Sequence, residues 1–145
     1  MIKKVVFTLF LFLANILLAG EAHELATELH YLESYQQGIQ TAKKEHKMMM
    51  LVVVQDDCHW CKKFKRTTLS DSGIKEQIAD IVKVMVDRYA NMPQKFESKF
   101  FPMVFFVNPQ TQNVLVTSYG YKTKELFTQK IQKARDKFRR LQEQK

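Results

Sequence analysis

The sequence predicts one α/β domain in which a mixed central β-sheet is covered by helices. Beyond residue 33, segments with helical spacing alternate with short apolar runs. Such alternation is typical of parallel strands joined by right-handed helical crossovers. The last two apolar runs, 103–107 and 114–118, are separated by a turn sequence that starts with Asn108-Pro109, which predicts an antiparallel hairpin. A chain of 145 residues holds one such core and not two.

The elements before residue 55 are predicted to be two helices and a strand. Residues 24–32 carry leucines at helical spacing, although 29–32 would also suit a short edge strand. Ser34 can cap the next helix, with a glutamine three positions later in capping-box geometry, and Gly38 weakens that helix. Residues 48–54 are continuously apolar, which indicates a strand buried on both faces.

The middle of the chain is predicted to contain three helices and a strand. Residues 58–69 are expected to form a helix, and a short helix capped by Asp71 or Ser72 follows it. Residues 81–86 are rich in β-branched side chains and predict a strand. A helix from Asn91 to about Lys99 is also expected, because its proline falls in the first turn, where a missing amide proton costs little.

A long last helix is expected after Thr123, which is a suitable N-cap residue. Its apolar side chains recur at helical spacing and predict one buried face: Phe127, Ile131, Ala134, Phe138 and Leu141.

Residues 1–20 are predicted to be a secretory signal peptide. Lys3 and Lys4 precede an apolar run, and small residues follow it near Gly20 and Ala22. The run is shorter than the roughly twenty apolar residues of a spanning helix. Cleavage after Gly20 or after Ala22 fits equally well, so residues 21–145 are expected to form the single mature domain. Export to a bacterial periplasm would place the chain where disulfides persist.

The charge of the chain is basic but dispersed. Formal net charge is +8, and 8 − 2 = +6 remains without Lys3 and Lys4. No groove-reading motif accompanies this charge, so we expect a basic soluble surface and no nucleic-acid partner.

Cys58 and Cys61 are the two cysteines of the chain, and they stand where the predicted strand leads into a helix. Disulfide exchange needs an attacking thiolate and a second thiol that resolves the mixed disulfide. At a helix start, unpaired amides and the positive end of the dipole stabilise a thiolate. We therefore assign Cys58 as the nucleophile and Cys61, one turn into the helix and less exposed, as the resolving thiol.

Three other uses of the cysteine pair are less consistent with the sequence. A purely structural disulfide would close a very small loop and add little stability. A zinc site needs four ligands, and the histidines outside the motif lack suitable spacing, so no metal is expected. Covalent haem attachment requires a histidine after the second cysteine, where Lys62 stands. No cofactor is expected.

Three features in order make the chain similar to the thioredoxin-fold family. They are the Cys58-His59-Trp60-Cys61 motif between strand and helix, Ser70-Asp71 followed by a helix and a strand that ends at Asp87, and Phe101-Pro102 before an apolar strand. Pro102 follows Cys58 by 102 − 58 = 44 residues, which suits the family. Over roughly residues 34–138, the chain most resembles exported, single-domain thioredoxin-like proteins of bacteria.

The resemblance implies a thioredoxin fold, with a cis-proline at Pro102 facing the cysteines. It also implies a monomer with protein thiols and disulfides as substrates, and a membrane-bound redox partner that resets the cysteines. Three positions depart from the family pattern: Val52 replaces a frequent buried acid, Asp57 a frequent tryptophan, and Phe101 a frequent threonine. These departures bear on partner choice and on proton transfer.

The neighbours of the cysteines are predicted to tune the exchange. A charged His59 and Lys62 favour a Cys58 thiolate, whereas Asp56 and Asp57 oppose it. Exposed pairs of this kind contribute at most about 1 kcal/mol each, so we assign no sign to their net effect on the pKa of Cys58. Trp60 belongs to this tuning set, and it also offers an apolar surface for substrate polypeptides.

Phe101 is expected to extend the surface of Trp60. The backbone before Pro102 is expected to pair with an extended segment of the substrate, as in strand addition.

The favoured hypothesis is a periplasmic thiol:disulfide oxidoreductase. Reductive or isomerase-like use is slightly favoured, because the motif lacks the proline and histidine arrangement of strong oxidants and no extra helical domain is present. A thioredoxin-like binding module, docking a partner through Trp60 and Phe101 with an incidental disulfide, is the alternative. A dedicated carrier for one sulfur-metabolism or cytochrome-assembly partner is a third possibility.

Overall fold

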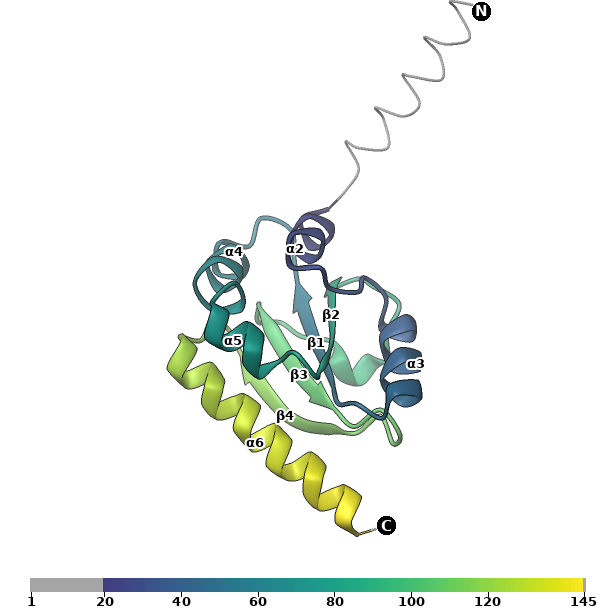
Figure 1. The fold of residues 1–145 in the computed structure, drawn as a ribbon. Helices are drawn as coiled ribbons and strands as arrows, with labels where there is room; N and C mark the ends of the chain where they lie inside the picture. Colours follow the sequence, from purple (N-terminus) through teal and green to yellow (C-terminus); the bar gives the residue numbers. More distant parts are fainter. Residues whose placement is uncertain (1–19, 145) are drawn as a thin grey trace, which may run out of the picture.

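The structure, a computed structural model, describes residues 20–144 (Figure 1). Nearly all of the predicted signal peptide, residues 1–19, lies outside the described residues. Within residues 20–144, no helix is long and apolar enough to span a membrane.

One four-stranded sheet forms the centre of the described chain, in the order β2-β1-β3-β4. Its strands are β1 (Met49–Val54), β2 (Val82–Asp87), β3 (Met103–Val107) and β4 (Val114–Tyr119). β1 and β2 are parallel, whereas β3 is antiparallel to both β1 and β4. The predicted mixed sheet with a final hairpin is confirmed.

β1 is the central strand, and all of its residues are buried. Side chains alternate across a strand, so β1 contributes to both faces of the sheet. Met50, Val52 and Val54 face a core that also contains the cysteines. Met49, Leu51 and Val53 are part of a second core on the other face. The continuous apolar run therefore marks a strand covered on both sides, as predicted.

Helices cover both faces of the sheet (Figure 1). The core that contains the cysteines is closed by side chains from α2 (Glu21–Leu29), α4 (His59–Phe64), α5 (Ser72–Gln77) and α6 (Lys124–Glu143). The opposite core is closed by α3 (Tyr35–Glu45) and by Phe96. The cysteines thus belong to the larger, four-helix side of the domain.

The predicted helix caps agree with the structure. The Ser34 side chain accepts a hydrogen bond from the amide of Gln37, and Asp71 accepts from the amides of Gly73 and Ile74. Thr123 accepts from the amide of Leu126 at the start of α6. Side-chain oxygens at these positions satisfy helix amides that have no partner within the helix.

The predicted helix from Asn91 to Lys99 is wrong. A single 3-10 turn, Gln94–Phe96, forms there, and Pro93 and Glu97 on either side have extended ψ values of 142° and 141°. Phe96 is fully buried, with its ring 5.2 Å from both Tyr35 and Phe105. The chain around Phe96 follows the path that buries this ring between α3 and β3. A longer helix would move the ring out of this position.

Three smaller differences concern element ends. The first helix begins at Glu21 and stops at Leu29, and Leu32 then forms an isolated parallel bridge with Val84. The helix predicted over residues 58–69 becomes a π-helical turn after Phe64. On α6, Leu141 remains 42% exposed, because the last turns of α6 extend past the end of the sheet (Figure 1).

Candidate functional site

Cys58 and Cys61 follow the carboxyl end of β1, at the start of α4. α4 lies beside α2 (Figure 1). The chain leaves β1 through Gln55, turns at Asp56-Asp57, and enters α4 with Cys58 as the N-cap residue. Asp57 has a φ of 56°, in the left-handed region that aspartate tolerates better than most residues. The turn therefore sets the first cysteine at the helix N-terminus, as the sequence predicts.

The two cysteines form a disulfide, with their Cα atoms 5.2 Å apart. The amide of Cys61 donates a hydrogen bond to Cys58 Sγ over 3.1 Å. The same donor and the helix dipole would stabilise a negative charge on Cys58 Sγ after reduction. The arrangement can therefore support thiolate chemistry at Cys58.

The disulfide is largely covered, since Cys58 is 6% exposed and Cys61 is 2% exposed. Ala22 and Leu25 of α2 share a hydrophobic cluster with both cysteines. Two ion pairs, Glu21 with Lys62 and Glu28 with Lys65, also connect α2 to the cysteine helix and the π-helical turn after it. α2 is therefore part of the site, and Cys58 is the slightly more exposed residue of the two.

Trp60 is 50% exposed, and its ring packs on the loop before α6. The ring centroid lies 5.7 Å from that of Tyr121 and 5.3 Å from that of His59. Lys63 Nζ lies 5.1 Å from the Trp60 centroid and 4.9 Å from the Tyr121 centroid. Sequence reasoning missed Tyr121, although an aromatic residue directly after Gly120 and near a helix cap was a usable indication.

The Phe101–Pro102 peptide bond is cis, and Pro102 is buried. Met103, the next residue, pairs with Val53 of β1, so Pro102 lies at the same end of the sheet as the cysteines. Phe101 is partly buried, and Arg88 Cζ lies 5.1 Å from its ring centroid. In the described chain the aromatic rings that pair with Trp60 are those of His59 and Tyr121, whereas Phe101 packs against the buried clusters on both faces of the sheet.

The charged residues that sequence reasoning singled out differ in their environment. Asp57 and His59 are exposed, and Lys62 is paired with Glu21. The Asp56 carboxylate accepts a hydrogen bond from the backbone amide of Glu21 over 3.0 Å. Exposed charges act weakly on the sulfur because water screens them.

Glu21 is the residue of the site that sequence reasoning missed. It opens α2, and its side chain is 8% exposed. Its position at the boundary of the predicted signal peptide hid its role. It precedes Leu25 by four residues, which places an acid on the apolar face of the helix and could have revealed it.

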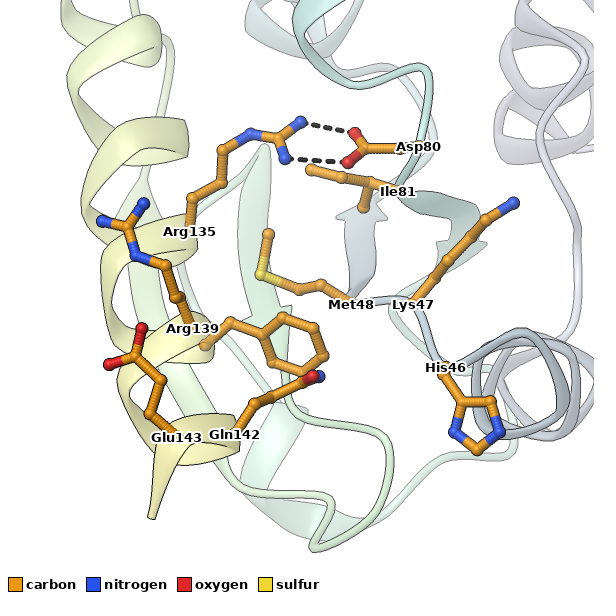
Figure 2. Close-up of a pocket in the computed structure, with 10 residues that line it drawn as sticks. His46, Lys47, Met48, Asp80, Ile81, Arg135, Arg139, Gln142 and Glu143 are labelled. Carbon is orange, nitrogen blue, oxygen red and sulfur yellow. Dashed lines mark hydrogen bonds and ion pairs between the residues drawn. The ribbon is translucent and has the colours of Figure 1, made fainter. Parts of the chain in front are cut away.

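A cavity of about 510 Å³ lies away from the cysteines, between α6 and the loop before β1 (Figure 2). Its lining includes His46, Lys47 and Arg139, and Arg135 forms two hydrogen bonds with Asp80 beside it. The hydrogen bonds from Arg135 hold the pKa of Asp80 below its ordinary value. In residues 20–144, no three His, Cys, Asp or Glu side chains group as metal ligands.

Comparisons with known proteins agree with this geometry. Residues 35–135 match the family model described as a thioredoxin-like domain. A thioredoxin from Thermus thermophilus is 17% identical, with 70% of this chain and 84% of that chain covered and a TM-score of 0.61. The reduced DsbD C-terminal domain of Neisseria meningitidis is 22% identical, with 68% and 92% covered and a TM-score of 0.55. A DsbH oxidoreductase is 18% identical, with 71% and 82% covered and a TM-score of 0.56. No curated protein matches the sequence.

Proposed function

The chain belongs to the thioredoxin-like domain family, and from this we propose that it is an exported thiol:disulfide oxidoreductase acting on proteins in the periplasm. The observation that carries the proposal is the bridged Cys58–Cys61 pair at the N-terminus of α4, with the Cys61 amide donating to Cys58 Sγ. This is the arrangement that a nucleophilic thiolate and a resolving thiol require. The predicted signal peptide supports export.

In the reducing direction, the Cys58 thiolate attacks one sulfur of a substrate disulfide. A bond forms between Cys58 Sγ and that sulfur, and the second substrate sulfur leaves as a thiolate that takes up a proton. Cys61 then loses its proton and attacks Cys58 Sγ. This step closes the Cys58–Cys61 disulfide and releases the reduced substrate, and the oxidising direction reverses both steps. A membrane-bound redox partner is proposed to reset the pair.

The half-exposed ring of Trp60, which packs on the partly buried Tyr121, is proposed to hold the substrate polypeptide next to the sulfur. Half-exposed aromatic rings favour partner contact because they bury much apolar area with few rotatable bonds. The backbone at Phe101, just before Pro102, is proposed to pair with an extended substrate segment. Phe101 and Trp60 would then contact the substrate at different points.

The test combines an equilibrium with two cysteine variants. Equilibrium with glutathione gives the redox potential, and a value near that of thioredoxin, about −270 mV, supports reductive use. A far more oxidising potential would overturn this direction. Cys61→Ser should accumulate mixed disulfides with periplasmic proteins, and one captured protein rather than many would favour a dedicated carrier.

Cys58→Ala distinguishes an enzyme from a binding module. The variant should lose reduction of insulin disulfides, because no nucleophile remains. Cys61→Ser is the matched comparison, since it keeps the attacking sulfur and should stop at a mixed disulfide with insulin, which Cys58→Ala should not form. If Cys58→Ala preserves partner binding and the cellular phenotype, the disulfide is incidental and the enzyme proposal fails.

A further inference from the structure

Glu21 places a buried carboxylate against the cysteine helix. Its Oε2 accepts a hydrogen bond from the amide of Cys58 over 3.4 Å, and lies 3.5 Å from Lys62 Nζ. Its Oε1 is buried and has no hydrogen-bond partner among residues 20–144. Burying a polar oxygen without a partner is unfavourable, more so for a charged group. This unfavourable burial directly beside a disulfide points to a role in the chemistry of the disulfide.

The other charged groups at this end of the molecule are more exposed. Asp56 and Asp57 in the loop and His59 on α4 are exposed, and the Lys62 side chain is 56% exposed. Water screens these charges, whereas a charge with little water around it acts more strongly. On the side of the cysteines, β1 contributes the buried, apolar side chains of Met50, Val52 and Val54. Glu21 is therefore the group best placed to change how readily the Cys58 thiol loses its proton.

We propose that Glu21 sets the acidity of the Cys58 thiol and thereby the redox balance of the Cys58–Cys61 pair. The inference rests on the proposed function. The negative charge of Glu21 opposes a thiolate at Cys58, and it also draws Lys62 away from that sulfur. A less stable thiolate disfavours the reduced pair, which makes the protein a stronger reductant. Glu21 is a positioning residue, since it acts through the Cys58 amide and Lys62.

The cleavage site of the predicted signal peptide decides whether the mature chain contains Glu21. Cleavage after Gly20 retains Glu21, and the new α-ammonium group would lie where the Glu21 amide now donates to Asp56 Oδ1 over 3.0 Å. Cleavage after Ala22 would remove the carboxylate and the buried Ala22 side chain. A role for Glu21 therefore requires that the mature chain begin no later than Glu21.

The experiment uses protein exported and processed from the full-length gene, with its N-terminus defined by intact mass. Glu21→Gln removes the charge with little change of shape, and Glu24→Gln is the matched control on the exposed side of α2. The first readout is the rate of Cys58 alkylation as a function of pH. The second is the equilibrium in which two glutathione thiols reduce the disulfide and become glutathione disulfide. A purely structural role would lower thermal stability without moving either readout.

Glu21→Gln should move the pH profile of Cys58 alkylation to lower pH. At pH values below the midpoint of the wild-type profile, the variant should react about threefold faster than the wild type, or more. The equilibrium constant for reduction by glutathione should rise by a similar factor, while Glu24→Gln matches the wild type. Unchanged profiles in Glu21→Gln, or a mature chain that starts after Glu21, would overturn the inference. Failure of the wild type to exchange with glutathione would instead overturn the proposed function.

A second measurement covers the case in which Glu21→Gln does not fold. The carboxyl carbon resonance of Glu21 in the wild-type protein should show an inflection at the pH where Cys58 ionises, because a new charge close to the carboxyl group changes its chemical shift. The inflection should be present in the reduced protein and missing from the oxidised one. Its absence from the reduced protein would refute the coupling.

Discussion

Gly38→Ala tests how closely α3 packs against β2. Gly38 is buried in the middle of α3, and a Cβ atom at this position would lie 2.3 Å from Val84 Cγ2 and 3.0 Å from Met49 Sδ. The first distance is far below van der Waals contact, and Val84 is fully buried in the sheet. The substitution must therefore move the helix or the strand.

Two opposing contributions set the size of the effect. Alanine in a helix interior is favoured over glycine by about 1 kcal/mol. Overpacking a close-packed core costs about 1–3 kcal/mol. The clash should dominate, and Gly38→Ala should lower the free energy of unfolding by about 1 kcal/mol. For a domain of this size, this lowers Tm by about 3–5 °C.

Urea unfolding of four proteins provides the assay: wild type, Gly38→Ala, Val84→Ala and the double variant. Val84→Ala alone should cost about 2 kcal/mol for the lost methyl groups. The double variant should be more stable than the sum of the single effects predicts, by about 2 kcal/mol, because the clash with Val84 is gone while the gain in helix propensity remains. Gln40→Ala, exposed on the same helix, is the control for helix propensity. A more stable Gly38→Ala with no coupling to Val84 would refute the close approach.

Two further predictions concern the aromatic surface and the ion pair beside the cavity. Trp60→Ala should lower kcat/KM for a protein disulfide by about fivefold, and more than for glutathione, if the exposed half of the ring contacts polypeptide as proposed. Equal losses with both substrates would contradict this role. Asp80→Asn should lower the free energy of unfolding at pH 7 by about 0.5–1 kcal/mol, since Arg135 depresses the pKa of Asp80 but the pair is partly exposed. A depressed carboxyl stabilises the fold above its unfolded pKa of about 3.9, and this stabilisation disappears as pH falls through the folded pKa. Asp80→Asn should thus have a lower free energy of unfolding than the wild type at pH 7 and an equal one at about pH 2.5. An equal loss at both pH values would refute the argument.

The candidate site was partly predictable from the sequence. Cys58 and Cys61 were identifiable because a strand, two thiols and a helix follow one another along the chain, and helix-start chemistry is local. The half-exposed state of Trp60 also followed from its place within the motif. The contact of Trp60 with Tyr121 was not predictable, because the two rings are brought together by the packing of α4 on the loop before α6.

The sequence by itself determined the four strands of the sheet and the caps of three helices, at Ser34, Asp71 and Thr123. The side-chain oxygens of Ser34 and Thr123 accept hydrogen bonds from backbone amides three residues later, so a local pattern predicts them. The continuous apolar run at β1 is likewise visible within a few residues of sequence. The tertiary structure alone decided three features. Burial of Phe96 leaves a single turn where a helix was predicted. β2 lies so close to α3 that a side chain at Gly38 would clash with Val84. The packing of α2 places Glu21 next to Cys58. Each depends on a contact between segments far apart in the chain, and local spacing holds no information about such contacts.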